Sequence, residues 1–355
     1  MGDGRRVLVT GIAGQLAGLT ALALEEQDQV EAVFGVDVRA PQHDLRRTEF
    51  VRADIRNPLI ARVIETASID TVVHLSTTSK PSAAGGRNSM KERNVIGAMQ
   101  LLAASQQAPS LRRFVLKSST AVYGSAHADP AMFREDAGPV TPARGFAKDT
   151  TEIEGYVRAF GRRRKDVDVS ILRFSNFLGG RVDSAFYSLF TLPVVPTVLG
   201  YDPRLQFIHE DDAVEVLVRA TVEDHPGVFN VAGEGVLYLS QCVRLAGRIP
   251  APVPQPFVSA VASAVRRSRR GDFAADQLQF LQFGRAVDTT RLREEFGYTP
   301  QYSSRAAFED FVQRRKISGL VDRDDVARWE QELYGFLQRK GQTRRLATPR
   351  RESRR

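Results

Sequence analysis

A short glycine-containing segment near the N-terminus has the residue types and spacing of a dinucleotide-binding turn. It follows an apolar run at residues 7–9 and precedes a Leu- and Ala-rich stretch at 19–24. Glycine allows the backbone to approach a pyrophosphate, and a helix N-terminus offers unpaired N–H groups and a positive dipole end. We therefore expect this turn to contact a dinucleotide cofactor, through Gly11, Ile12, Ala13, Gly14, Gln15 and Leu16.

An acidic residue stands where the second strand of such a unit would end. The apolar run 32–36 leads into Asp37, about 20 residues beyond the turn. A carboxylate there bonds the ribose hydroxyls and repels a 2′-phosphate, which favours NAD over NADP. Arg39 could instead receive that phosphate, so NADP is the less favoured alternative. A plain turn at the strand end is the structural alternative for Asp37.

Composition bounds the class of protein. The 355 residues suit one large α/β unit with an attached lobe. Cys242 is the one cysteine, which excludes an internal disulfide and a cysteine-cluster metal site, and the sequence shows no other metal-binding pattern. No apolar run approaches the ~20 residues of a membrane span, and the N-terminus lacks a signal-peptide core. We expect a cytoplasmic protein without a metal or a transmembrane segment.

The net charge of +8 is concentrated at one end of the chain. Residues 338–355 hold eight basic side chains and one acidic one, so the remainder is nearly neutral. We expect this tail to be disordered, because it lacks apolar periodicity. Weak contact of the tail with anionic lipid or RNA is an alternative, but the body of the chain is not that of a nucleic-acid-binding protein.

The elements that must position these residues follow an alternating pattern. Apolar runs typical of strands recur at 7–9, 33–36, 71–75, 114–116, 169–172 and 228–231, separated by helical stretches. This order predicts an α/β fold, a doubly wound parallel sheet of the Rossmann type with a smaller C-terminal substrate lobe. We expect the dinucleotide domain at 1–177 plus about 206–235, and the lobe at about 178–205 plus 236–337.

Three helices are predicted with particular roles. One spans 90–105 after a cap at Asn88 or Ser89, and one spans 146–160 with an apolar face. A third, at 257–265, ends in a basic cluster at 266–270. We interpret it as a lobe or lid helix, with a membrane-surface element as the alternative.

Several short motifs follow one another in a recognisable order. They are Gly11-x-x-Gly14-x-x-Ala17, Asp37, Asp54-Ile55-Arg56, His74-Leu75-Ser76, Asn94-Val95-Ile96-Gly97, Ser118-Ser119-Thr120-Ala121-Val122-Tyr123-Gly124, Leu172-Arg173-Phe174-Ser175-Asn176 and Phe207-Ile208-His209-Glu210-Asp211-Asp212. This order resembles the extended short-chain dehydrogenase/reductases, specifically the NAD-dependent epimerase/dehydratase family that acts on nucleotide sugars. The resemblance spans about four fifths of the chain and ends near Phe296-Gly297-Tyr298-Thr299-Pro300.

The resemblance implies roles for the matching positions. At the cofactor, Asp54 and Ile55 would lie at the adenine, and His74, Leu75 and Ser76 would line its middle. Ser119 would hydrogen-bond the reacting sugar hydroxyl, with Thr120 as the alternative. Asn176 would lie near the substrate diphosphate. The family's substrate-binding arginine would fall at Leu205, so the neighbouring Arg204 is our candidate for that contact.

The chain departs from the family at the acid/base position. The family places a tyrosine four residues before a lysine that holds the nicotinamide ribose. Lys148 matches this lysine, so the resemblance implies that it binds the cofactor, whereas Arg144 stands at the tyrosine position. No tyrosine of the chain has a lysine four residues later. Arginine stays protonated, with a pKa above about 12, so it cannot act as a base near neutral pH. It can clamp an anion or stabilise a developing alkoxide with its planar donors.

Two functions remain open from the sequence. The first is an enzyme that transiently oxidises a nucleotide sugar or related hydroxylated substrate, with Ser119, Lys148 and Arg144 at the reacting end. The second is an NAD-binding sensor or complex component without turnover, with Arg144 exposed to solvent. The resemblance also implies a homodimer formed through the helices near 90–107 and 146–160.

Overall fold

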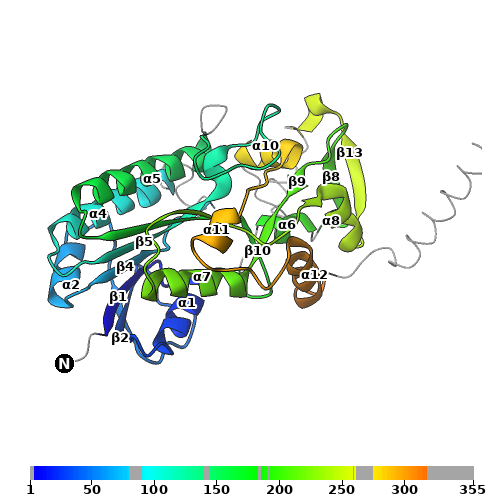
Figure 1. The fold of residues 1–355 in the computed structure, drawn as a ribbon. Coiled ribbons are helices and arrows are strands. Elements are labelled where there is room, and N and C mark those ends of the chain that lie inside the picture. The colour runs from blue at the N-terminus through cyan, green and yellow to red at the C-terminus, as the bar shows by residue number, and fades with distance from the viewer. Residues whose placement is uncertain are drawn as a thin grey trace, which may run out of the picture.

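The computed structural model describes residues 4–79, 90–138, 144–182, 185–190, 192–258, 260 and 275–317. Its centre is a seven-stranded parallel sheet with the order β11-β6-β5-β4-β1-β2-β3 (Figure 1). The strands are β1 (Arg5–Thr10), β2 (Val30–Asp37), β3 (Thr48–Arg52), β4 (Thr71–His74), β5 (Arg113–Ser119), β6 (Asp168–Phe174) and β11 (Gly227–Val231). The predicted fold, a doubly wound Rossmann-type sheet, is confirmed.

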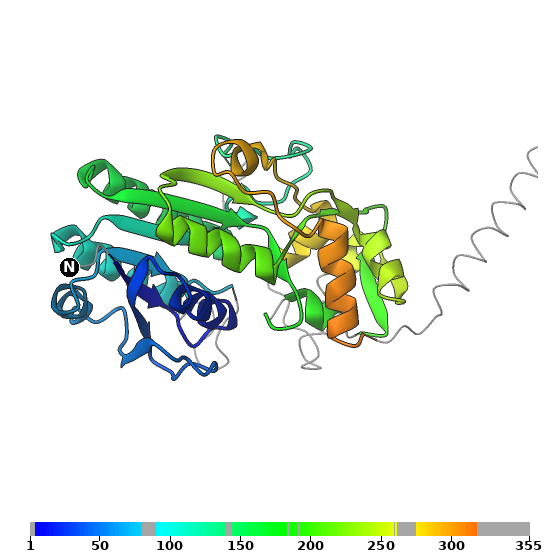
Figure 2. The ribbon, with the colours of Figure 1, turned by 60° about the horizontal axis from the view of Figure 1, so that its bottom comes forward.

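Helices cover both faces of the sheet because its strands carry apolar side chains on both sides. On one face α1 (Gln15–Glu25) and α7 (Glu210–Val222) enclose a core cluster that includes Val115 of β5. On the other face α2 (Ile60–Thr66), α4 (Gly97–Gln107) and α5 (Gly145–Arg163) enclose a second cluster that includes Leu116. Figures 1 and 2 show the sheet between these two layers.

The predicted helices correspond to longer or composite elements. The apolar face expected at 146–160 is buried in α5, through Ile153, Val157 and Phe160. The helix expected at 90–105 contains a π-helical segment, η1 (Glu92–Ile96), that continues into α4. Its two candidate caps, Asn88 and Ser89, lie outside the described residues. Strand β3, at the sheet edge, adds a seventh strand to the six expected runs.

The remaining elements form a second region beside the carboxyl end of the sheet (Figure 2). Three short strand pairs run through it: β7 (Asn176–Leu178) with β10 (Phe207–His209), β9 (Arg204–Leu205) with β12 (Leu237–Tyr238), and β8 (Val194–Val198) with β13 (Ile249–Val253). Its helices are α6 (Ala185–Phe190), α8 (Leu239–Leu245), α10 (Ala275–Phe283) and α12 (Ser304–Arg314).

This region has its own core cluster, which includes Phe207, Phe308 and Phe311. The predicted domain bounds stay a prediction. One segment within the range expected for the lobe packs elsewhere: α11 (Thr290–Glu294) places Leu292 in the cluster between the sheet and α7, and Phe296 follows it. This segment packs against β11, the strand at one edge of the sheet. Covering an edge strand in this way explains why the segment packs on the sheet rather than in the lobe.

Two predicted segments fall largely or wholly outside the described residues. The basic tail 338–355 is one, and most of the helix expected at 257–265 is the other; Phe257 itself ends a 3₁₀ turn, η3 (Gln255–Phe257). Within the described ranges, no helix has the length and apolar character needed to cross a membrane.

Candidate functional site

A cavity of about 880 Å³ opens at the carboxyl edge of the sheet. Strands β1, β2, β4 and β5 are parallel, so the loops that leave them meet at this edge. Strand order reverses between β1 and β4, which is where doubly wound sheets form ligand crevices. The walls come from the glycine turn, the ends of β2, β3, β4 and β5, the start of α5, and residues of the second region that include Asn176, Phe177, Gln279, Phe280 and Arg285.

The glycine turn forms a close cradle at one end of the cavity. Gly11 has φ +78, and a Cβ atom there would lie 2.7 Å from the Cα of Ser76. A Cβ on Gly14, which precedes the first turn of α1, would lie 3.2 Å from the carbonyl oxygen of Gly11. Only glycine leaves this space open at Gly11, and the backbone amides beyond it lead into the helix N-terminus. The cradle therefore fits the diphosphate of a dinucleotide.

The Asp37 carboxylate is held by two backbone amides at the same end. Its Oδ2 accepts a hydrogen bond from the Ala13 amide at 3.2 Å, and its Oδ1 accepts one from the Arg39 amide at 3.1 Å. Asp37 and Arg39 both line the cavity. Two backbone amides thus fix the carboxylate at the cavity wall, and Arg39, the alternative candidate for contact with a 2′-phosphate, lies beside it.

Asp54 and Ile55 also line this end. The Arg56 side chain donates to both carboxylate oxygens of Asp54, including a bond of 2.6 Å from Nη2 to Oδ2. These hydrogen bonds lower the pKa of Asp54 below its usual value, against a smaller opposing effect of burial. Asp54 is therefore ionised and fixed in place at neutral pH.

Two predicted cofactor contacts have side chains that do not line the cavity. Ile12 is fully buried and lies beneath Gly35, where a Cβ would be 2.7 Å from its Cγ1. His74 is also buried, with Nδ1 2.8 Å from the Thr10 hydroxyl. Burial, with a contribution from the charge of Lys117, lowers the pKa of His74 to about 3, so its ring is neutral. Among the other predicted contacts, the lining includes Gly11, Ala13, Gly14, Gln15, Leu16, Leu75 and Ser76.

Away from the glycine cradle, Ser119 is present in the lining and Thr120 is absent from it. The Ser119 hydroxyl accepts a hydrogen bond from the Ala121 amide at 3.1 Å, which caps the 3₁₀ turn η2 (Thr120–Tyr123). Thr120 is buried. Tyr123 is buried too, and its hydroxyl donates to Asn230 at 2.7 Å and accepts from Arg173 at 2.7 Å. Tyr123 is therefore a structural group.

The Arg144 and Lys148 side chains are placed differently. Arg144 is the N-cap of α5, has an extended backbone, and lines the cavity. Lys148, one turn into the helix, does not line it; its side chain is 58% exposed and its Nζ lies 4.0 Å from Glu152. The structure thus brings Arg144 to the cavity and leaves the lysine of the motif outside its walls.

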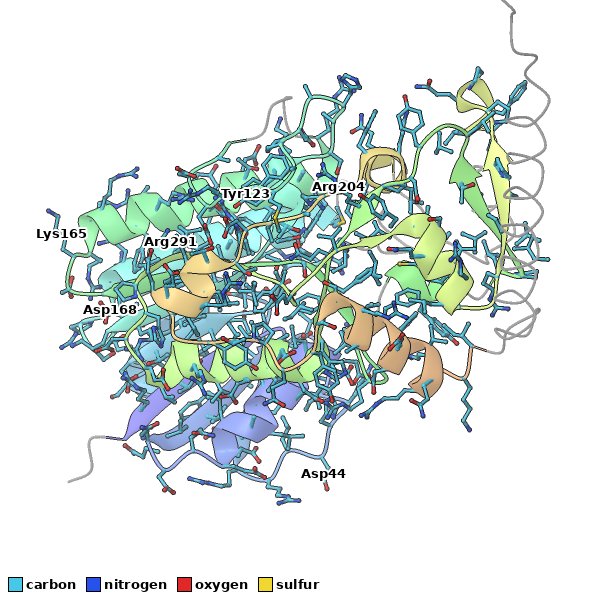
Figure 3. The ribbon with its side chains drawn as sticks, turned by 45° about the vertical axis from the view of Figure 1, so that its right-hand side comes forward. Asp44, Tyr123, Lys165, Asp168, Arg204 and Arg291 are labelled. Carbon is cyan, nitrogen blue, oxygen red and sulfur yellow. The ribbon has the colours of Figure 1, made fainter. Side chains whose placement is uncertain are left out.

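Of the two remaining predicted substrate contacts, Asn176 lines the cavity and Arg204 does not. Arg204 instead holds a neighbour through its backbone, since its carbonyl accepts from the Arg285 amide at 2.9 Å. Arg285 lines the cavity, and its Nη1 donates to the Gly124 carbonyl at 2.7 Å. Burial lowers the pKa of Arg285 to about 10, which leaves it charged at neutral pH. Figure 3 labels Arg204 in the second region.

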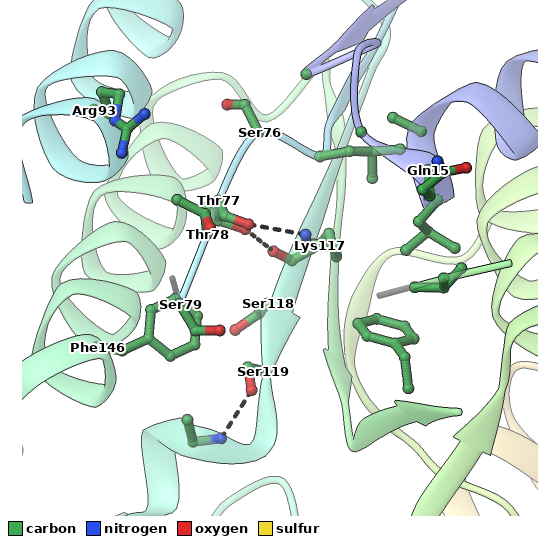
Figure 4. A pocket seen from close by; sticks show the side chains of 18 of the residues that line it. Gln15, Ser76, Thr77, Thr78, Ser79, Arg93, Lys117, Ser118, Ser119 and Phe146 are labelled. Carbon is green, nitrogen blue, oxygen red and sulfur yellow. Dashed lines mark hydrogen bonds between the residues drawn. The ribbon is translucent and has the colours of Figure 1, made fainter. Parts of the chain in front are cut away.

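Three cations of the lining were not foreseen from the sequence: Arg93, Lys117 and Arg285. Lys117 interrupts an apolar strand run at the point where β5 reaches the cavity, which is the signal that could have identified it. Arg285 comes from a segment more than 100 residues beyond Ser119, and nothing local marks it. Figure 4 shows Arg93, Lys117 and Ser119 around the cavity.

A buried polar network packs beside the end of β5 that carries Ser119. Arg173 donates to both carboxylate oxygens of Glu154, at 2.9 and 2.7 Å, and the Ser118 hydroxyl donates to the same carboxylate at 2.6 Å. The network joins β5, β6 and α5 and fixes the strand end that carries Ser119. In the part of the chain that the structure describes, no group of three or more acidic, histidine or cysteine side chains could hold a metal ion.

Comparison with known sequences identifies relatives. An uncharacterized protein of Mycobacterium tuberculosis is 45% identical over 340 residues, which make up 94% of this chain and 90% of that protein. An uncharacterized protein of Sinorhizobium fredii is 25% identical over 320 residues, or 84% of this chain and 76% of that protein.

Solved structures share the fold. A dTDP-glucose 4,6-dehydratase from Bacillus anthracis in complex with NAD is similar with a TM-score of 0.68 and 17% identity, over 88% of this chain and 97% of that one. A UDP-glucose 4-epimerase from Thermotoga maritima with UDP-glucose has a TM-score of 0.67 and 18% identity, over 88% and 98%. The sequence model of the NAD dependent epimerase/dehydratase family matches residues 7–232. With a match over more than half of its length, the chain belongs to this family, and its cofactor is NAD.

Proposed function

We propose that this protein is an enzyme that transiently oxidises a hydroxyl group of a nucleotide sugar or a related hydroxylated substrate. One observation carries the proposal. A single cavity contains the glycine cradle and Asp37 at one end and Ser119, Asn176 and Arg285 at the other. A dinucleotide and a second, anionic ligand can therefore meet within one cavity.

The residues at the first end would hold NAD. The amides near Gly14 and the start of α1 would receive the diphosphate, Asp37 the ribose hydroxyls, and Asp54 and Ile55 would border the adenine. When bound, NAD supplies a hydride acceptor that later returns the hydride. The remaining chemistry depends on how the protein orients the substrate and where it moves the hydroxyl proton.

The residues at the second end suit an anionic, hydroxylated ligand. Arg285 contributes positive charge to the lining, and a diphosphate is the group that such a forked donor binds well. Asn176 would add an amide donor. Ser119 would hydrogen-bond the reacting hydroxyl, since it lies on the strand end that the buried network fixes.

Arg144 stands at the cavity in the sequence position where the family has its acid/base tyrosine. It cannot accept a proton near neutral pH, so we propose that it binds a substrate anion or stabilises the developing alkoxide. The proton must then go to a different group.

A second candidate function is NAD binding without turnover, as a sensor or a component of a complex. The placement of Lys148 favours it, because the lysine that holds the nicotinamide ribose in the family lies outside the cavity lining here. The two candidates share the cofactor and differ in hydride transfer.

The experiment that tests the proposal begins with the protein as purified, whose bound nucleotide is identified by mass spectrometry. Saturating NAD is then added with UDP-glucose, UDP-glucuronic acid or dTDP-glucose, sugars found with or acted on by the similar proteins. We expect reduced cofactor to form transiently, with a changed sugar in the products. If the protein binds NAD and none of a broad panel of nucleotide sugars yields reduced cofactor or product, the sensor function replaces the enzyme.

We further propose a cytoplasmic homodimer that pairs α4 and α5 of two copies. Met99 on α4 and Tyr156 on α5 are exposed apolar side chains, at 42% and 39%. Sedimentation analysis should give the mass of a dimer, and a Met99→Glu/Tyr156→Glu double variant should shift it to that of a monomer. A monomeric starting protein contradicts the proposal.

A further inference from the structure

Lys117 lies on the same side of β5 as Ser119. Side chains alternate along a strand, and Ser118 between them donates to Glu154 of α5, although Ser118 also belongs to the cavity lining. Two residues of a strand span roughly 6–7 Å, a distance that the long lysine side chain can cover. Both residues line the cavity, so one ligand can reach both.

A reciprocal pair of hydrogen bonds holds Lys117. Its Nζ donates to the Thr77 carbonyl at 2.9 Å, and the Thr77 hydroxyl donates to the Lys117 carbonyl at 3.2 Å (Figure 4). Among the described residues, no carboxylate lies within ion-pair distance of Nζ. Within that part of the chain, the amine therefore has one backbone acceptor and no countercharge.

The groups that face Lys117 do not supply a negative charge. His74 on β4 is neutral, and Glu154 of α5 lies on the far side of β5, bound to Arg173. The other titratable groups at this end of the lining are cations, Arg144 and Arg285. Burial of the amine lowers its pKa to about 8, so a neutral form is accessible near physiological pH.

We propose that the amine of Lys117 exchanges the proton with the substrate hydroxyl, in place of a tyrosine on α5. This inference rests on the proposed function, since it assigns the proton-transfer group of the same site. It follows from the placement of the candidates: Arg144 cannot take a proton, Lys148 lies outside the lining, and Tyr123 is committed to the buried network.

The step balances with groups that the site supplies. The hydroxyl O–H bond breaks, and its proton goes to the lone pair of Lys117 Nζ, which becomes an ammonium. The carbon–oxygen bond becomes a carbonyl as the hydrogen on that carbon leaves with its electron pair, a hydride that bound NAD would accept. The reverse transfer returns the proton from the ammonium to the oxygen.

The first test needs no substrate. The full-length protein is labelled with trace acetic anhydride between about pH 6 and pH 10, with and without NAD, and acylation of each lysine is measured by peptide mass spectrometry. We expect Lys117 to become reactive around pH 8, at a lower pH than Lys165, an exposed residue that follows α5 (Figure 3). We also expect bound NAD to protect Lys117 from acylation. Acylation of Lys117 in parallel with Lys165, or none at any pH, overturns the proposal.

The second test separates a proton carrier from a fixed charge. Lys117→Arg keeps a cation that cannot lose its proton, and Lys117→Met removes the amine. We expect both variants to bind NAD within about tenfold of the unaltered protein. With a sugar that turns over, both should slow formation of reduced cofactor by more than about 100-fold, in line with loss of a general base. The matched control is Lys165→Met, which should leave the rate unchanged.

The outcomes distinguish this inference from the proposed function. If Lys117→Arg retains hydride transfer, Lys117 supplies only charge and the inference is wrong, while the enzyme function stands. If no sugar turns over, the enzyme function fails, and the acylation profile alone decides whether Lys117 is a titrating amine at the cofactor site.

Discussion

The backbone amide of Ala13 donates to the carboxylate Oδ2 of Asp37 at 3.2 Å, which ties the glycine turn to the end of the neighbouring strand. This hydrogen bond fixes the position of the acid relative to the turn. A ligand that contacts both must match the spacing fixed by this hydrogen bond, and a dinucleotide spans it with its diphosphate and ribose.

Replacing Asp37 by Ser should weaken NAD binding about tenfold or more. The change removes a charged hydrogen-bond acceptor worth about 1.5–3 kcal/mol. NADP should weaken less or bind more tightly, because Arg39 remains in the cavity wall without the repelling carboxylate. Calorimetric titration with each nucleotide measures both effects. The control is Asp44→Ser, an exposed residue outside the lining, and equal NAD affinity in the two variants would contradict the assigned role of Asp37.

Replacing Gly11 by Ala should lower both stability and NAD affinity. The new Cβ would lie 2.7 Å from Ser76 Cα, at a backbone angle that alanine adopts at a cost. The matched control is Gly155→Ala in α5, where nothing lies within 4 Å of the added atom. That variant should gain about 0.5–1 kcal/mol from the helix preference of alanine. Urea unfolding and NAD titration of both variants check the contrast.

The Glu154–Arg173 pair should make the protein sensitive to acid. Burial by itself raises the pKa of Glu154, but the hydrogen bonds and charge of Arg173, with Ser118 and Arg158, outweigh it and leave the pKa lowered. A lowered carboxyl pKa contributes stability that is present above the unfolded-state value, near 4.3, and is lost as the pH falls through the folded-state value.

Glu154→Gln tests this pair. The variant should lose about 3–5 kcal/mol at neutral pH, because it leaves the Arg173 guanidinium buried without its countercharge. Its unfolding free energy should also depend less on pH below about 5. The control is Glu309→Gln, one member of an exposed pair with Arg305, which should change stability by less than about 1 kcal/mol. Similar losses of unfolding free energy in the two variants would show that the buried pair stabilises the fold no more than the exposed pair does.

Replacing Arg144 by Tyr should separate the two candidate functions. If Arg144 binds a substrate anion, the variant should lose about 1.5–3 kcal/mol of binding, which is roughly 10-fold to 100-fold. An increase in hydride transfer would instead identify a site that had lost its acid/base group. Transient formation of reduced cofactor measures the change, and Arg144→Lys shows how much of any loss comes from the planar fork of arginine rather than from its charge.

The cofactor half of the site could be predicted from the sequence because its signals are local. A glycine turn between a strand and a helix, and an acid at the end of the next strand, lie within 27 residues of one another. Parallel-strand geometry then brings them together without further information. The alternation of apolar runs with helical stretches predicted the sheet for the same reason.

The substrate half of the site was decided only by the tertiary structure. It brings Arg285 from the second region to the cavity while the side chain of Arg204 stays outside, and it turns Lys148 away while Lys117 points in. These placements depend on which face of a strand or helix is covered and on contacts between residues more than 100 positions apart. The sequence by itself determined that the chain holds a dinucleotide. The packing of the lobe and of α5 against the sheet decided which charged groups meet that ligand, because burial and countercharge exist only in the folded state.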